Sequence, residues 1–168
     1  DPDLAVEEYL RVIRSKTAKL FEASARLGAI LAGADAATEE ACAGYGRSLG
    51  TAFQLVDDLL DYDGETHELG KNVGDDLREG KPTLPLLVAM DRGSAAERAL
   101  IRSAIEQGEV TRLQEVVTAV RRTGALDAAR AVAQAEADQA RSCLQVLPPT
   151  PFREALLDLC ARAVDRSS

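Results

Sequence analysis

Helical periodicity runs through most of this 168-residue chain and constrains its fold more than any other feature. Between residues 4 and 31, non-charged side chains recur every three or four positions, the spacing of one helix face. The residues on this face are Leu10, Ile13, Thr17, Leu20, Ser24, Leu27 and Leu31. We expect one long helix here, with this face turned towards a core.

The rest of the sequence continues the helical pattern. A second helix is expected from an Asp35 or Thr38 cap to Tyr62, a buried one from near Thr83 to Gly93, and others over 94–107, 109–123, 126–147 and 151–166. The second helix holds glycines at 44, 46 and 50, and each costs roughly 1 kcal/mol relative to Ala. They indicate close approach of another helix or a ligand. Ser94-Ala95-Ala96-Glu97 has the capping-box pattern.

Composition agrees with a single all-α domain, because aromatic residues make up only 4% of the chain. The net charge of −8 argues against a nucleic-acid partner. Cys42, Cys143 and Cys160 lack CxxC spacing, which favours buried free thiols and a cytoplasmic location. No apolar run reaches the length of a membrane span, and we expect no signal peptide.

A stripe of polar side chains stands out near the end of the second helix. Gln54, Asp57, Asp58 and Asp61 are spaced by three, four and seven residues, so they share one helix face. Carboxylates packed this closely repel one another, and a cation would offset the repulsion. Oxygen ligands without His or Cys favour Mg²⁺, which completes its shell with water and substrate phosphates. The alternative is a solvated acidic face.

Other polar residues gain meaning beside this stripe. Lys16 and Thr17 form a polar pair within the first helix, although taken alone they are better explained as an exposed Lys beside a Thr tolerated in the core. Residues 63–76 are polar and Gly-rich and predict a long loop, a type that is usually functional or disordered. We expect the chain between Lys71 and Lys81 to return towards the helix that carries the aspartates. His67 has no evident partner in the sequence.

Four blocks of the sequence resemble the trans-polyprenyl diphosphate synthases, in order and spacing. They are Lys16-Thr17-Ala18-Lys19-Leu20-Phe21, Phe53 to Tyr62, Leu69 to Leu77, and Glu79-Gly80-Lys81-Pro82-Thr83-Leu84-Pro85-Leu86. The chain is similar to the bacterial octaprenyl type over essentially its whole length. A lone DDxxD motif would be weak support, but four ordered blocks are strong support.

The resemblance implies an all-α bundle around a central cavity, in a homodimer that joins isopentenyl diphosphate to an allylic diphosphate such as farnesyl diphosphate. It makes Asp57, Asp58 and Asp61, at 57–61, the second aspartate-rich motif, which holds Mg²⁺. It places Lys16 and Lys71 at the leaving diphosphate, and Thr17 and Gln54 at the ionising carbon. Asp76 would support the metal shell and Lys71, and Lys81 would lie further out on the substrate-binding side.

The sequence departs from the family pattern in one respect. No DDxxD motif precedes Lys16 in these 168 residues, which begin at Asp1 rather than Met. We therefore expect residues 1–168 to be the C-terminal half of a single synthase domain, inactive alone. The alternatives are a non-catalytic or regulatory subunit of a heteromeric synthase, a terpene cyclase or head-to-head synthase, and an inert helical bundle.

The role implied for Lys71 gives a direct test in the complete enzyme. Lys71→Ala should raise the KM for the allylic diphosphate far more than the KM for isopentenyl diphosphate, because only the allylic leaving group would lose a cation. Steady-state kinetics with each substrate varied in turn measures this. An equal rise in both KM values would indicate that Lys71 has a structural role, or that the two substrate subsites are assigned the wrong way round.

Overall fold

The computed structural model describes residues 1–63, 74–108 and 110–166, and all regular structure in these residues is helical. The chain divides into two compact units. One unit comprises Asp1–Tyr9 and Asp57–Ala131, and the other comprises Leu10–Val56 and Val132–Ser167.

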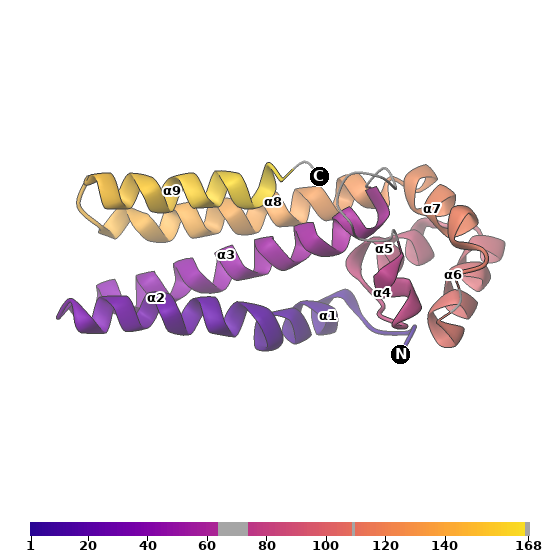
Figure 1. Cartoon of the computed structure of the whole chain (residues 1–168), viewed down its shortest axis with the longest axis horizontal. Helices are drawn as coiled ribbons and strands as arrows, with labels where there is room; N and C mark the ends of the chain where they lie inside the picture. Colours follow the sequence, from indigo (N-terminus) through magenta and orange to yellow (C-terminus); the bar gives the residue numbers. More distant parts are fainter. Residues whose placement is uncertain (64–73, 109, 167–168) are drawn as a thin grey trace. The chain divides into compact units, whose positions relative to one another are not determined.

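Long helices build the unit that contains residues 10–56. Its elements are the end of α1 (Val6–Ile13), a π-helical turn (Arg14–Ala18), α2 (Lys19–Leu31), most of α3 (Ala36–Asp63), the later part of α8 (Ala125–Cys143), a 3-10 turn (Leu144–Val146) and α9 (Pro151–Val164) (Figure 1). Tyr45 and Leu49 of α3 pack in one apolar cluster with Leu144 and with Cys160 and Ala163 of α9. This cluster joins α3, the 3-10 turn and α9.

Gly46 and Gly50 of α3 lie where the π-helical turn and α2 approach it closely, as the sequence predicts. A Cβ atom at Gly46 would lie 2.4 Å from the carbonyl oxygen of Phe21, and one at Gly50 would lie 2.7 Å from the Cα atom of Ala18. Both neighbours are backbone atoms and cannot move aside cheaply. Glycine is therefore required here by packing, in spite of its cost within a helix.

The π-helical turn at Arg14–Ala18 interrupts the long first helix that the sequence predicts. A π turn adds a residue to the helix, and one residue corresponds to about 100° of rotation. Ile13, before the turn, is buried as expected, but Leu20, Leu27 and Leu31 beyond it are 72%, 54% and 79% exposed. The prediction that one face of residues 4–31 turns towards a core is therefore wrong after the turn.

Short helices build the unit that contains residues 57–131. They are α4 (Asp75–Arg78), α5 (Leu84–Arg92), α6 (Ala95–Gln107) and α7 (Leu113–Arg122). The buried helix predicted near residues 83–93 is confirmed as α5, which contacts α6 and α7. Ser94 caps α6 in the predicted capping box. Arg98 also donates from its side chain to the carbonyl oxygen of Met90, which fastens α6 to the end of α5.

Some predicted boundaries differ from the observed ones. The helix expected from residue 109 begins only at Leu113, because the residues just before it form a turn in which the Leu113 N–H donates to the Val110 carbonyl. The loop predicted for 63–76 ends in a helix, since α4 begins at Asp75. Residues 64–73 of that loop, including His67 and Lys71, lie outside the described residues.

The three cysteines are free thiols, as the sequence predicts. Only Cys160 is fully buried, whereas Cys42 and Cys143 are half-buried, so the expected burial is right for one of the three. The Cys143 sulfur packs against α3 at Gly44, because a Cβ atom there would be 3.0 Å from it.

The glycine contacts of α3 predict a difference in stability between two Gly→Ala variants. Gly46→Ala should lower the free energy of unfolding by about 1–3 kcal/mol, because the new methyl group meets the backbone of Phe21. Gly28→Ala in α2 is the matched control, since a Cβ atom there meets nothing within 4 Å. That change should raise stability by up to about 1 kcal/mol through helix propensity.

Urea denaturation followed by circular dichroism measures both variants. If Gly46→Ala proved as stable as Gly28→Ala, the close contact between α2 and α3 would not exist in solution.

Candidate functional site

Three carboxylates lie in the last two turns of α3, as the sequence predicts. Asp58 is 5% exposed, whereas Asp57 and Asp61 are half-buried. Asp58 accepts a hydrogen bond from the hydroxyl of Tyr9, with 2.6 Å between the oxygens. The sequence gave no sign of Tyr9 beyond its helical spacing four residues before Ile13, so this partner comes from the structure alone.

Asp61 holds the start of α4. Its Oδ1 and Oδ2 atoms accept the backbone N–H groups of Asp75 and Asp76 at 3.2 and 3.1 Å, and its carbonyl oxygen accepts the N–H of Gly74 at 3.1 Å. Gly74 makes the turn possible because its φ of 87° is in the left-handed region, which side chains rarely tolerate. Asp61 is thus a structural anchor as well as a predicted metal ligand.

The environment of Asp61 disfavours its negative charge. Burial raises the pKa of its carboxyl to about 6, and the neighbouring Asp76 adds to the rise, against the two backbone hydrogen bonds that lower it. A carboxyl group with this pKa is still mainly ionised at neutral pH. A cation close to Asp61 would therefore be stabilising.

Asp76 and Lys81 form an ion pair beside this anchor. The Lys81 Nζ atom lies 3.0 Å from Asp76 and 2.7 Å from Glu79. These two carboxylates raise the pKa of Lys81, with the hydrogen bond to Glu79 the largest contribution. Lys81 is therefore engaged by acidic side chains in this state, and its predicted part in substrate binding stays a prediction.

In the other unit, the structure brings together two predicted site residues that lie 37 positions apart in sequence. The Thr17 hydroxyl donates to the Oε1 atom of Gln54 at 2.8 Å. Thr17 and the exposed Lys16 belong to the π-helical turn. Such turns are rare and are frequent at functional sites, but the sequence gave no sign of this one.

A complete metal site is not formed by the described residues. Within residues 1–63, 74–108 and 110–166, no three His, Cys, Asp or Glu side chains form a group that could hold a metal ion. The predicted ligands do fit Mg²⁺ in their chemistry, because carboxylate oxygens are its preferred protein ligands. They also fit in charge, since the pKa of Asp61 is raised. Asp57, Asp58 and Asp61 could supply one or two ligands to Mg²⁺. Water and the oxygens of a bound diphosphate would complete the coordination shell.

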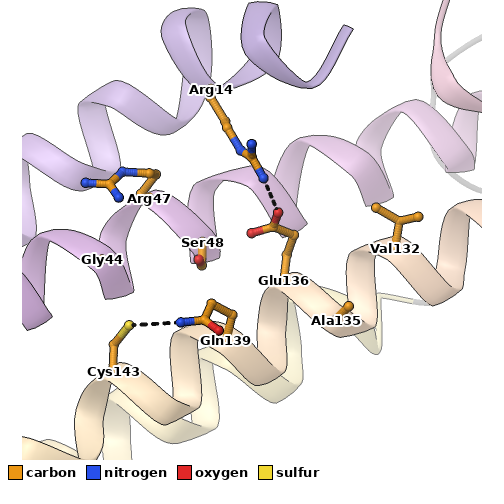
Figure 2. A pocket seen from close by; sticks show the side chains of 9 residues that line it. All are labelled: Arg14, Gly44, Arg47, Ser48, Val132, Ala135, Glu136, Gln139 and Cys143. Atoms are coloured by element: carbon orange, nitrogen blue, oxygen red, sulfur yellow. Dashed lines mark hydrogen bonds and ion pairs between the residues drawn. The ribbon is translucent and has the colours of Figure 1, made fainter. Parts of the chain in front are cut away.

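A separate cavity of about 480 Å³ lies among the π-helical turn, α3 and α8 (Figure 2). Arg14 and Glu136 form an ion pair of 2.6 Å at it, and Gln139 donates to the Cys143 sulfur at 3.8 Å. None of the predicted site residues lines this cavity. Because several of its polar groups already pair with one another, the cavity does not by itself indicate a ligand.

Comparison with known proteins identifies the class. Residues 1–122 match the Polyprenyl synthetase family, so the chain belongs to that family. It is 56% identical over 167 residues to the octaprenyl diphosphate synthase of Escherichia coli, covering 99% of this chain and 52% of that protein. It is 51% identical over 168 residues to the octaprenyl diphosphate synthase of Haemophilus influenzae.

Solved structures confirm the predicted fold class. A decaprenyl diphosphate synthase from Rhodobacter capsulatus aligns with a TM-score of 0.91 and 42% identity, over 100% of this chain and 52% of that one. A polyprenyl synthase from Caulobacter crescentus, complexed with calcium and isoprenyl diphosphate, aligns at 0.92 and 45%, with the same coverage. The chain therefore spans about half the length of the relatives it matches. In its described part, no helix is both long and apolar enough to cross a membrane.

The raised pKa of Asp61 predicts how pH affects the metal-free protein. A carboxyl whose pKa is about 6 when folded and about 3.9 when unfolded binds more protons in the folded state between those values. Its contribution to the free energy of unfolding is therefore present below pH 4 and is lost as pH rises through 6. Asp61→Asn should remove this part of the pH dependence.

Urea midpoints measured from pH 4 to pH 7 in EDTA test the prediction. Asp158→Asn is the control, because it removes the same charge from an exposed position on α9. Parallel curves for the wild type and Asp61→Asn would show that Asp61 has an ordinary pKa.

Proposed function

We propose that this chain provides the second aspartate-rich motif of a Mg²⁺-dependent polyprenyl diphosphate synthase of the octaprenyl type. The reaction is the head-to-tail condensation of isopentenyl diphosphate with an allylic diphosphate such as farnesyl diphosphate. Family membership and 56% identity to an octaprenyl diphosphate synthase support the proposal. The observation that carries it is the group of three carboxylates, Asp57, Asp58 and Asp61, in the last two turns of α3.

The carboxylates would hold Mg²⁺ at the diphosphate of the allylic substrate. Bound Mg²⁺ would supply Lewis-acid stabilisation of the leaving diphosphate. Asp57 is the residue we assign to direct contact, because it matches the first aspartate of the family's second aspartate-rich motif. Asp76 would support the site without contacting the metal, since its N–H donates to Asp61 and its carboxylate pairs with Lys81.

Lys16 and Lys71 would stabilise the charge that returns to the diphosphate. When the allylic C–O bond breaks, its electron pair leaves with the diphosphate and positive charge develops on carbon. Fixed cations at the leaving oxygens lower the barrier of that step. Lys16 is exposed at the π-helical turn and can reach a ligand, whereas Lys71 lies outside the described residues.

Thr17 and Gln54 would stabilise the allylic cation. Because the Thr17 hydroxyl hydrogen is donated to Gln54, the Thr17 oxygen can present its lone pairs to positive charge. The alkene of isopentenyl diphosphate then attacks the cation, forming the new C–C bond, and a proton passes to the departed diphosphate. No nucleophilic side chain is needed for this reaction.

We further propose that the remaining half of the domain is needed for activity, because relatives of this chain are about twice its length. That half would supply the first aspartate-rich motif and the site for isopentenyl diphosphate. We propose a cytoplasmic location, which the three free thiols favour. We also propose that the protein is a homodimer, by similarity to the family.

Loss of the Asp57 carboxylate should abolish turnover in the intact protein. Asp57→Ala should lower kcat by about 100-fold or more, the usual scale for removing electrostatic stabilisation of the transition state. Incorporation of isopentenyl diphosphate onto farnesyl diphosphate in Mg²⁺ measures kcat, and circular dichroism checks the fold. Asp91→Ala, at an exposed position of α5, is the matched control. Near-normal turnover would remove Asp57 from the metal site.

A second candidate is a regulatory subunit of a heteromeric synthase. Such subunits tend to lose their aspartate-rich motif, whereas Asp57, Asp58 and Asp61 are all present here. The same assay decides between the candidates. An intact protein that is inactive alone and becomes active with a second synthase chain would support the regulatory subunit.

A further inference from the structure

Tyr9 and Asp58 form a buried polar contact at the aspartate-rich motif. The two side chains are 4% and 5% exposed and come from α1 and α3, 49 residues apart. Their oxygens are 2.6 Å apart, which is in the range of a charge-assisted O–H···O⁻ hydrogen bond. A contact of this kind is stronger than one between neutral groups.

The Tyr9 hydroxyl donates this hydrogen bond and the Oδ2 atom of Asp58 accepts it. The direction follows from the groups themselves, because an ionised carboxylate can only accept and the hydroxyl is the one donor of the pair.

This arrangement restricts the Asp58 side chain. A carboxylate at the end of a helix can rotate about its side-chain bonds, but the Tyr9 hydroxyl holds its Oδ2 atom. Tyr9 itself is fixed by its burial.

We propose that Tyr9 is a positioning residue for metal binding, which holds the Asp58 carboxylate in the orientation that receives Mg²⁺ with diphosphate. This inference rests on the proposed function, since it assigns Asp58 to the metal site. It does not make Tyr9 a ligand. Tyr9 acts only through the hydrogen bond to Asp58.

Tyr9→Phe tests the inference, because the ring stays in the core and only the hydroxyl is removed. The readout is the Mg²⁺ concentration that gives half of the rise in melting temperature of the intact protein, at a fixed saturating concentration of inorganic diphosphate. Losing a hydrogen bond to a buried charge should raise this concentration about tenfold. The melting temperature without Mg²⁺ is recorded separately.

Tyr45→Phe is the matched control. Tyr45 is also buried and donates its hydroxyl to a backbone carbonyl, that of Leu156, at 3.3 Å. Any general loss of stability from removing a buried hydroxyl should appear in both variants, but the Mg²⁺ concentration should change only in Tyr9→Phe. An equal change in the two variants would overturn the positioning role.

A double-mutant cycle shows whether Tyr9 acts through Asp58. Tyr9→Phe should have no further effect on the half-saturating Mg²⁺ concentration in the Asp58→Asn background, whereas independent effects would add. Additivity would overturn the inference.

The outcomes also separate this inference from the proposed function. A wild type that responds to Mg²⁺ and diphosphate, with Tyr9→Phe identical to it, would overturn the role of Tyr9 alone. A wild type with no response would overturn both.

Discussion

Burial of negative charge at the end of α3 is the constraint on which the unit around residues 57–131 depends. An ionised carboxylate is costly to remove from water unless hydrogen bonds or cations compensate. Asp58 is compensated by the Tyr9 hydroxyl, and Asp61 by the backbone N–H groups that begin α4. The compensation is incomplete, because the pKa of Asp61 is still raised. Burial therefore still disfavours the negative charge of Asp61 in the folded chain.

The other unit depends on close helix packing rather than on charge. Gly46 and Gly50 allow α2 to approach the backbone of α3, and the neighbouring cluster of Tyr45, Leu49 and Cys160 fills the opposite contact with α9. This packing brings the π-helical turn with Thr17 within hydrogen-bond distance of Gln54. The polar pair is therefore a product of the same small residues that weaken α3 as an isolated helix.

Local signals predicted the helices well and their irregularities poorly. Proline and the capping box identified the starts of α5 and α6, because these signals act within one helical turn. The π-helical turn was not predicted, and the exposure of Leu20, Leu27 and Leu31 was wrong as a result. The residue added by a π turn rotates all later side chains of the helix to a different face. The three- and four-residue spacing of apolar side chains in the sequence does not reveal it.

The sequence by itself determined the family, the all-α fold and the group of candidate residues, since these follow from short motifs whose order and spacing are read along the chain. Only the tertiary structure decided which partners those residues have. The contacts of Asp58 with Tyr9 and of Thr17 with Gln54 join residues 49 and 37 positions apart. Helical spacing extends over a few turns of one helix, whereas contacts between helices depend on how closely their side chains allow the backbones to pack.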